Sequence, residues 1–439
     1  MPRGRRHESV ESSIVMRTTR PRVTFLVLAV CAVISATVTA QTDLAARARA
    51  LHKQSPLIDG HNDYPWALRD LDPGRDFAKA DITGSVPKLM TDIPRLKQGG
   101  LGGQFWSVYV PSTMQGKEAV RATLEQIDIV HRMTRRWPET FVLSRTAADV
   151  ERAFKSGKIA SMIGMEGGHS IDNSLATLRM LSSLGAGYMT LTHSANVPWA
   201  DSATDKPVLG GLSKFGEEVV REMNWLGMLV DLSHVSPDTM EDAIRVSEAP
   251  VIFSHSSARA ICDVPRNVPD KVLQMIPKNG GVVMITFVPG FISQAVADHG
   301  AKATAAQQSY RAQFPSNEAS VNAAMERWRA ENPEPRATLS QVADHIDHVK
   351  KIAGIDHIGF GGDFDGITTV VQGLEDVSKY PDLTAELLKR GYTDQDIKKI
   401  VGLNVLRVMR EAERVSMELH KKRGPSTATI EVMDKAGTQ

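Results

Sequence analysis

Residues 159–166 read IASMIGME, an almost uninterrupted apolar run that closes on a carboxylate. Residues 281–287, GVVMITF, form a second run of the same kind. Strands that are apolar at nearly every position are typical of a parallel sheet buried on both faces. The two stretches therefore indicate an α/β protein whose strands are covered by other elements.

Apolar runs of similar length recur along the chain, each bounded by Gly or polar residues. There are eight, covering residues 55–61, 103–110, 158–166, 187–193, 226–234, 250–255, 281–287 and 356–363. Helical periodicity fills most of the intervals, as in residues 174–184, 214–225, 239–246 and 339–352. Strands that alternate with helices pair in parallel, because a parallel crossover needs a covering segment of about a dozen residues. Eight such units predict a (β/α)8 TIM barrel.

An open, doubly wound sheet is the competing architecture. No G-x-G-x-x-G follows the first run, which disfavours the dinucleotide-binding form of that fold.

Residues 297–335 are rich in Ala, Gln, Glu and Arg, and they predict a helical insertion before the last strand. The sequence contains neither a G-x-S-x-G elbow nor a P-loop, so a serine enzyme of the α/β-hydrolase type and an NTPase are both disfavoured.

The N-terminal region has the order of a secretory signal. Arg17, Arg20 and Arg22 precede an apolar run over residues 23–34, and small residues follow up to Ala40. This run is shorter than the roughly 20 residues of a membrane span. We therefore expect an exported protein, periplasmic or secreted, with no stable membrane anchor.

These features predict three parts of the chain. Residues 1–40 are expected to be a signal peptide cut before Gln41, residues 41–425 a TIM-barrel domain, and residues 426–439 a polar C-terminal tail. Cys262 is the one cysteine outside the predicted signal peptide, and a single cysteine forms no internal disulfide. We therefore expect the exported chain to be stabilised by its core or by metal.

The charge balance excludes one class of partner. The 439 residues include 52 Lys and Arg against 51 Asp and Glu, a formal net charge of +1. A chain with this balance has no basic field of the kind that drives binding to nucleic acids. We therefore expect no nucleic-acid partner.

Metal-type ligands or titratable groups stand at the ends of six of the eight runs. They are His61 with Asp63, Glu166, His193, His234, His255 and Asp363. The carboxyl ends of TIM-barrel strands converge on the active site. These side chains are therefore expected to meet, although they are far apart in the sequence.

The chemistry of five of these residues favours a pair of cations. His61 and Asp63 are two residues apart, so in extended chain they face the same side and can bind one ion. Glu166 can bridge two ions with its two oxygens, and His234 and His255 can complete the second site. Nitrogen and oxygen ligands without thiolate suit Zn²⁺, with Mn²⁺ or Co²⁺ as substitutes. Two such ions would lower the pKa of a bridging water.

Three further residues are candidates for handling a substrate. Asp363 could accept a proton from metal-bound water and return it to a leaving amine, and His193 is a candidate oxyanion donor or proton shuttle. Arg266 is suited to holding a substrate carboxylate, with Arg259 as the competing choice. For Asp365 we expect a turn residue.

Several ordered motifs resemble the membrane (renal) dipeptidase family and its bacterial members. They are DGHNDYPW, GMEGGHS, LTHSANVPWADS, DLSHVS, FSHSSARAICDVPRNVPD and GFGGDFDG, within a similarity that runs from about residue 57 to residue 410. The resemblance implies a binuclear zinc TIM-barrel hydrolase that cleaves dipeptides.

The resemblance also implies a role for each residue at a matching position. His61 and Asp63 would hold one zinc, Glu166 would bridge, and His234 and His255 would hold the other. The resemblance also implies a role for the remaining three residues. His193 would contact the scissile carbonyl, Arg266 would bind the terminal carboxylate of the substrate, and Asp363 would transfer the proton.

The sequence therefore predicts an exported zinc dipeptidase with two Zn²⁺ per chain and a metal-bridging hydroxide as nucleophile. A related metal-dependent amide or lactam hydrolase is the first alternative, because the same hydroxide attacks any reachable amide carbonyl. An exported binding protein that has lost turnover is the second. Its expected signature is a missing ligand or base, and none is missing here. Relatives of this fold suggest a homodimer.

Overall fold

A closed ring of parallel strands forms the core of the protein. The computed structural model describes residue 8 and residues 43–434. The strands are β1 (Leu57–Asn62), β2 (Leu101–Ser107), β3 (Phe141–Leu143), β4 (Ile159–Glu166), β5 (Ala186–Thr190), β6 (Leu229–Asp231), β7 (Ile252–Ser256), β8 (Val282–Ile285) and β9 (Ile358–Phe360). Their order is β2-β1-β9-β8-β7-β6-β5-β4, and the ring closes because β2 pairs with β4. The predicted TIM barrel is confirmed, with each of the eight predicted runs supplying one strand of the ring.

β3 lies outside the eight predicted runs. It pairs with β4 alone, in parallel, and takes no place in the closed ring. Only one of its three residues, Phe141, is buried. A strand this short and this exposed carries little periodic signal, which explains why the sequence pattern does not predict it.

Helices separate most of the strands and pack around the ring. They are α2 (Tyr64–Leu71), α3 (Ile93–Gly99), α4 (Lys117–Arg136), α5 (Ala147–Lys155), α6 (Leu175–Ser183), α7 (Lys214–Leu226), α8 (Pro237–Val246), α9 (Asp270–Leu273), α10 (Ile276–Asn279), α11 (Pro289–Ile292), α12 (Gln294–Gln313), α13 (Glu318–Glu331), α14 (Leu339–Ile352), α15 (Tyr380–Lys389), α16 (Asp394–Lys398), α17 (Asn404–Lys422) and α18 (Ile430–Met433). Residues 45–52 are also helical.

Side-chain caps begin several helices where the sequence predicts them. α14 spans the predicted residues 339–352, and Thr338 and Gln341 form a capping box at its start. α6 begins after Ser174, whose side chain accepts a hydrogen bond from the Thr177 N–H. Local polar signals and helical periodicity therefore agree at these helices.

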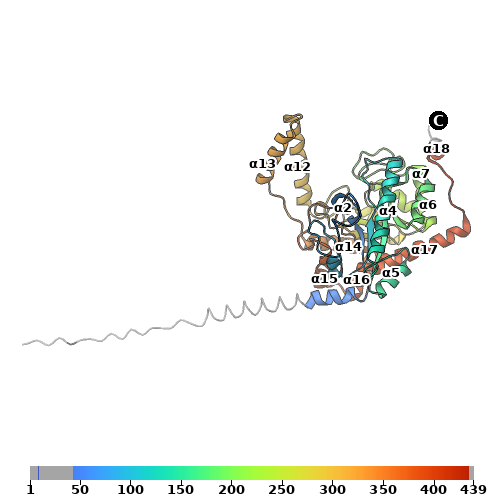
Figure 1. Cartoon of the computed structure of the whole chain (residues 1–439), viewed down its shortest axis with the longest axis horizontal. Helices are drawn as coiled ribbons and strands as arrows, with labels where there is room; N and C mark the ends of the chain where they lie inside the picture. Colours follow the sequence, from blue (N-terminus) through green and yellow to red (C-terminus); the bar gives the residue numbers. More distant parts are fainter. Residues whose placement is uncertain (1–7, 9–42, 435–439) are drawn as a thin grey trace, which may run out of the picture. The chain divides into compact units, whose positions relative to one another are not determined.

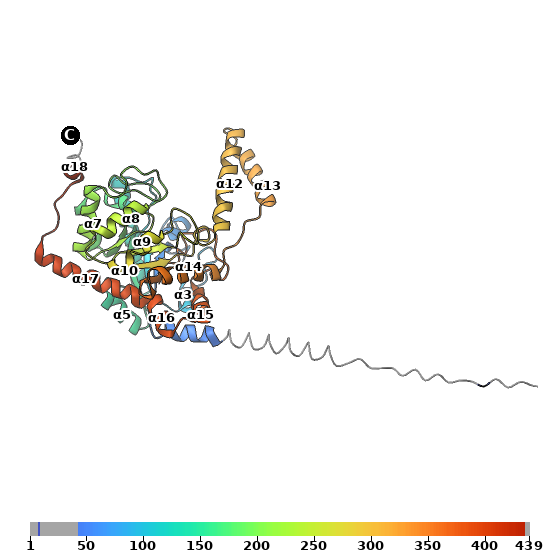
Figure 2. The same ribbon diagram turned by 180° about the vertical axis from the view of Figure 1, so that it is seen from behind.

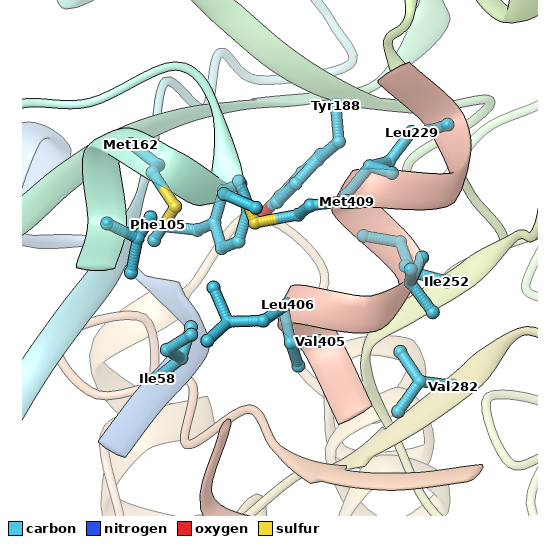
Figure 3. Packing of buried hydrophobic residues seen from close by; sticks show 14 of the residues in the cluster. Ile58, Phe105, Met162, Tyr188, Leu229, Ile252, Val282, Val405, Leu406 and Met409 are labelled. Atoms are coloured by element: carbon cyan, nitrogen blue, oxygen red, sulfur yellow. The ribbon is translucent and has the colours of Figure 1, made fainter. Parts of the chain in front are cut away.

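α17 closes the amino end of the barrel. Val405, Leu406 and Met409 of this helix lie in one buried cluster with residues near the starts of several strands, among them Ile252 and Val282 (Figure 3). Apolar burial of this kind stabilises a fold by roughly 25 cal/mol for each Å² removed from water. Apolar side chains of α17 therefore fill the centre of the ring at its amino end, whereas polar side chains gather at its carboxyl end.

The predicted helical insertion before the last strand is confirmed. α12 and α13 pack against each other and lie apart from the barrel strands (Figures 1 and 2). Val296 is the one buried residue of α12, while α13 buries Val321, Ala324 and Met325. The two helices therefore use their apolar side chains mainly against one another.

The predicted signal peptide, residues 1–40, lies outside the described residues except for Glu8. The limits of the barrel domain at 41 and 425 and the tail over 426–439 stay predictions. Within the described part of the chain, no helix is long and apolar enough to cross a membrane.

Burial of His345 predicts a pH dependence of stability. Its Nδ1 accepts from the Ala258 N–H at 3.1 Å, its Nε2 lies 3.0 Å from the Ile292 carbonyl oxygen, and burial lowers its pKa from 6.5 to about 4. Between pH 6.5 and about 4, His345 is therefore protonated in the unfolded chain but not in the folded chain. The free energy of unfolding falls as the pH drops through this window. At pH 5 we expect His345 to account for a loss of about 2 kcal/mol.

Urea unfolding at pH 7.5 and pH 5.0 measures this loss. His345→Gln keeps one donor and one acceptor but does not titrate, so its stability should change less between the two pH values than that of the wild type. His420→Gln, at an exposed histidine, is the matched control and should behave as the wild type does. Equal pH dependence in His345→Gln and the wild type would contradict the prediction.

Candidate metal centre and active site

The carboxyl end of the barrel opens into a polar cavity of about 420 Å³. Its lining includes Asp63, Glu166, His193, His234, Arg266 and Asp363. His61 and His255 lie directly behind this lining and are almost fully buried. The structure therefore brings together all eight residues that the sequence singled out for metal and substrate.

Glu166, the last residue of β4, lies at the centre of the site. Its Oε2 is 3.5 Å from His61 Nε2, while its Oε1 is 3.0 Å from His234 Nε2 and 3.5 Å from His255 Nε2. Oε1 also lies 3.7 Å from His193 Nε2. One oxygen of the carboxylate thus faces His61, and the other faces the three remaining imidazoles.

His61, Asp63 and Asp363 form a second group beside Glu166. His61 Nε2 lies 3.3 Å from Asp63 Oδ2. Backbone hydrogen bonds hold the two loops together: the Asp63 N–H donates to the Phe364 carbonyl at 2.9 Å, and the Asp363 N–H donates to the His61 carbonyl at 3.1 Å. The ends of β1 and β9 therefore bring the carboxylates of Asp63 and Asp363 to the same point.

These residues fit a pair of divalent cations. The site contains three overlapping groups whose candidate ligand atoms lie within 4.8 Å of one another: His61 with Glu166 and His255, Glu166 with His193 and His234, and His61 with Asp63 and Asp363. His61 Nε2 and Asp63 Oδ1 are buried and have no hydrogen-bond partner. Buried polar atoms are rarely left in this state unless a ligand or an ion completes them. The nitrogen and oxygen donors suit Zn²⁺.

The charges of the site also favour cations. Burial by itself lowers the pKa of His61, but Tyr188, Glu166 and Asp63 raise it well above its usual value, so positive charge is stabilised at this point. Burial would raise the pKa of Glu166, but the surrounding histidines, His61 first, hold it well below its usual value. Glu166 is therefore ionised, as a metal ligand must be.

Two other histidines are kept neutral. Burial, reinforced by Arg266 and neighbouring imidazoles, lowers the pKa of His234 well below its usual value. Burial likewise lowers the pKa of His255, with His61 and His234 adding to the effect. A neutral imidazole has the lone pair that a metal ion binds.

Neighbouring hydroxyls orient two of the imidazoles. The Tyr188 hydroxyl donates to the Gly60 carbonyl at 3.1 Å and lies 2.9 Å from His61 Nδ1. The Ser254 hydroxyl donates to Asp231 Oδ2 at 2.6 Å and lies 2.8 Å from His255 Nδ1. Each hydroxyl donates its proton to another acceptor, so it accepts a hydrogen bond from the Nδ1–H of the neighbouring histidine. The Nε2 atom of each of these histidines then remains available to a metal ion.

Sequence reasoning did not identify these supporting residues. Asp59 is a further example, since its carboxylate accepts hydrogen bonds from the His61 N–H at 2.7 Å, the Gly362 N–H at 2.8 Å and the Tyr380 hydroxyl at 2.6 Å. An acid inside an apolar strand, two residues before a ligand, was the available signal. Asp231 shows the same feature in β6, three residues before His234.

Backbone conformation at two site residues is unusual. His234 has φ of 70° and Asp363 has φ of 61°, in the left-handed region that side chains seldom adopt. Such conformations cost of the order of 1–3 kcal/mol and cluster at functional sites. The surrounding structure therefore holds both side chains in place against a local preference.

Arg266 and Arg259 lie in different surroundings. Arg266 is 4 % exposed, its Nη1 has no hydrogen-bond partner, and burial lowers its pKa to about 10, so it remains charged at neutral pH. Its guanidinium lies 5.3 Å from the centre of the Phe291 ring. Arg259 pairs with Asp263 at 2.8 Å and does not line the cavity. Of the two arginines, Arg266 is therefore the one that lines the cavity.

Asp365 is held by a turn, as expected from the sequence. It has φ of 65°, and its Oδ1 accepts from the Met90 N–H at 2.6 Å. Asp365 lines the cavity, but it belongs to none of the three ligand groups. The hydrogen bond from the Met90 N–H is a contact typical of a turn residue, while Oδ2 is buried and has no hydrogen-bond partner among the described residues.

Comparison with known proteins identifies the family. The family described as "Membrane dipeptidase (Peptidase family M19)" matches residues 45–423. The chain belongs to the membrane dipeptidase family. It is therefore a hydrolase of a metallopeptidase family, as the ordered motifs predicted. The relative "Dipeptidase verJ" from Clonostachys rogersoniana is 43% identical over 388 residues, which cover 86% of this chain and 89% of that protein.

Solved structures of similar proteins share the fold. The probable dipeptidase PvdM from Pseudomonas aeruginosa matches with a TM-score of 0.74 and 26% identity, over 85% of this chain and 99% of that one. A metallo peptidase from Rhodobacter sphaeroides, liganded with a phosphinate mimic of the dipeptide L-Ala-D-Ala, matches with a TM-score of 0.67 and 25% identity, over 82% of this chain and 99% of that one. The barrel of this chain is thus shared along almost the full length of both structures.

Proposed function

We propose that this chain is a binuclear zinc dipeptidase that hydrolyses the peptide bond of free dipeptides. The observation that carries the proposal is the placement of Glu166, whose two oxygens face separate imidazoles. His61 and Asp63 would hold one ion, His234 and His255 the other, and Glu166 would bridge them. Two zinc ions held by these residues would supply a hydroxide nucleophile at neutral pH and would stabilise negative charge on the carbonyl oxygen.

The remaining residues would bind and orient the dipeptide. Arg266 lies beyond β7 and Tyr109 beyond β2, and these two strands are opposite each other in the ring. A dipeptide whose carboxylate lies on Arg266 therefore extends across the cavity towards Trp66 and Tyr109, which line it. The phosphinate dipeptide mimic bound by the Rhodobacter sphaeroides relative supports a dipeptide in this cavity.

Two side chains would handle charge during the reaction. Burial lowers the pKa of His193, so it is neutral at pH 7 and can donate a hydrogen bond to the scissile carbonyl oxygen as negative charge develops. Asp363 would take the proton released when water attacks and return it to the departing amine. Both residues line the cavity beside Glu166.

Substrate profiling together with metal analysis tests the proposed function. The zinc-supplied enzyme should hydrolyse L-Ala-L-Ala or L-Ala-D-Ala, should fail on N-acetylated dipeptides and should lose activity with a chelator. Elemental analysis should find two zinc ions per chain. Preferential opening of a lactam would support the related amide hydrolase instead, and two bound ions without turnover of any amide would support a binding protein.

Arg266→Gln should weaken substrate binding more than turnover. A hydrogen bond to a charged group contributes about 1.5–3 kcal/mol, so we expect KM for dipeptides to rise about 10- to 100-fold with little change in kcat. Steady-state kinetics measure the effect. Dipeptide amides, which lack the carboxylate, should show no such rise.

Arg259→Gln is the matched control, since Arg259 is a nearby arginine that pairs with Asp263 outside the cavity. It should keep the wild-type KM. An unchanged KM in Arg266→Gln, or an equal rise in both variants, would show that Arg266 does not bind the carboxylate.

We further propose that residues 1–40 direct export and are removed before Gln41. The order of arginines, apolar run and small residues supports this proposal. N-terminal sequencing of the mature protein tests it. A homodimer is a separate proposal, which sedimentation analysis of the purified protein tests.

A further inference from the structure

A second cavity lies at the opposite end of the barrel from the metal centre. Its volume is about 550 Å³, and its lining includes Leu101 and Ile159, the first residues of β2 and β4. β4 carries Ile159 at this end and Glu166 at the other. At about 3.3 Å per residue, the two cavities are separated by about 23 Å along this strand.

Five cationic side chains surround this cavity: Arg49, Lys53, Lys97, Lys155 and Lys158. They come from three segments that are far apart in the sequence: the helix over residues 45–52 with the turn after it, the last turn of α3, and the end of α5 with the turn that leads to β4. Among the described residues, no Asp or Glu belongs to the lining. We refer to this cavity, defined by these five residues, as the basic pocket.

The five cations have no ionic partners within the described part of the chain. None of the ion pairs found there includes Arg49, Lys53, Lys97, Lys155 or Lys158, whereas Arg47 and Arg152, in the same two helices as Arg49 and Lys155, do pair with carboxylates. Arg49 and Lys53 are also close in the chain, since the Lys53 N–H donates to the Arg49 carbonyl at 3.3 Å just after the helix ends, and like charges at this spacing repel. Such a concentration of one charge attracts small ions of the opposite sign.

The floor of the basic pocket is partly apolar. Leu101 and Ile159 are buried there, and the ring of Phe154 is half-buried at the same surface. His52 is also in the lining. Its Nδ1 lies 3.3 Å from the Gly99 carbonyl oxygen and its Nε2 lies 2.9 Å from the Thr384 hydroxyl, so both ring nitrogens already have partners and neither is available to a ligand. A ligand with an apolar body and several negative charges matches this combination.

We propose that the basic pocket binds a small organic anion with two or more negative charges, of the phosphate-ester or polycarboxylate class. The volume of the cavity is that of a site for one small molecule. An extended polyanion such as a nucleic acid is not favoured, because the formal net charge of the whole chain is only +1. This proposal is independent of the reaction at the metal centre.

Isothermal titration calorimetry on the full-length, zinc-supplied protein tests the proposal. Naphthalene-1,5-disulfonate is a suitable probe, since it is a dianion with an apolar body and sulfonates are weak metal ligands. We expect one site per chain, with binding that weakens as salt is raised. The Lys97→Gln/Lys158→Gln variant should bind at least about tenfold more weakly, because two charge-assisted contacts are removed.

The control has the same change in charge at a distance from the pocket. Lys302→Gln/Lys351→Gln replaces two exposed lysines of α12 and α14 and should bind the probe as the wild type does. Both variants should keep the wild-type thermal unfolding midpoint, which separates loss of the site from loss of the fold.

Three results would overturn the proposal. One is the absence of any binding, and another is equal weakening in the two double variants, which would indicate a general charge effect. The third is binding to phosphatidylserine vesicles, lost in Lys97→Gln/Lys158→Gln, without binding of the soluble probe. That result would assign the cations to a membrane surface instead.

Discussion

Asp363→Asn should lower kcat for dipeptide hydrolysis by about 10³. Proton transfer by a positioned carboxylate contributes about 10²–10⁴ to a rate, and the amide of Asn neither accepts nor returns the proton. Asp363 is placed for this task by β9, which brings it within ligand distance of His61 and Asp63. Burial, with Asp63 and Glu166 nearby, raises its pKa well above the usual value, which favours a carboxyl that can hold a proton.

Steady-state and single-turnover kinetics on zinc-loaded protein measure the loss. Asp365→Asn is the matched control, because Asp365 lies in the same loop and lines the same cavity but accepts from the Met90 N–H. It should keep kcat within about threefold. If Asp363→Asn retained a tenth or more of the wild-type kcat with two zinc ions bound, the proton would have to pass through another group.

Glu166→Gln should remove both zinc binding and activity. The substitution keeps the shape of the side chain but removes the charge that faces His61 on one side and His234 on the other. A neutral amide cannot bridge two cations as a carboxylate does, so we expect fewer than two zinc ions per chain. We expect kcat/KM to fall by at least about 10³, since the nucleophilic water depends on the metal pair.

Elemental analysis after gel filtration, combined with kinetics at added zinc, measures both effects. Glu222→Gln is the matched control: Glu222 is also buried, but it pairs with Arg179 at 2.6 Å, away from the site. It should bind two zinc ions. Full zinc content and near wild-type kcat/KM in Glu166→Gln would exclude Glu166 as the bridging residue.

Much of the fold was predictable because its signals are local. Each barrel strand is a short apolar run, and α14 is marked by its own capping box between residues 338 and 341. The candidate ligands were predictable for a related reason. Once eight parallel strands are recognised, the topology of the barrel places the end of every strand on one face.

The supporting contacts were less predictable, since they join distant segments. The hydroxyl of Tyr188 in β5 reaches His61 in β1, and the hydroxyl of Tyr380 reaches Asp59. Nothing in the local pattern around either tyrosine indicates its partner. The short strand β3 was not predicted either, because a strand of three residues with only one buried side chain forms no recognisable pattern.

By itself, the sequence determined the type of barrel, the order of its strands and the identity of the candidate metal ligands, because periodicity and strand ends are properties of neighbouring residues. Only the tertiary structure decided that one oxygen of Glu166 faces His61 while the other faces three further histidines, and that His234 and Asp363 adopt left-handed conformations. It also decided that five cations from three segments share one pocket. These features arise when β2 pairs with β4 and the ring closes, which sets distances between residues that no local pattern relates.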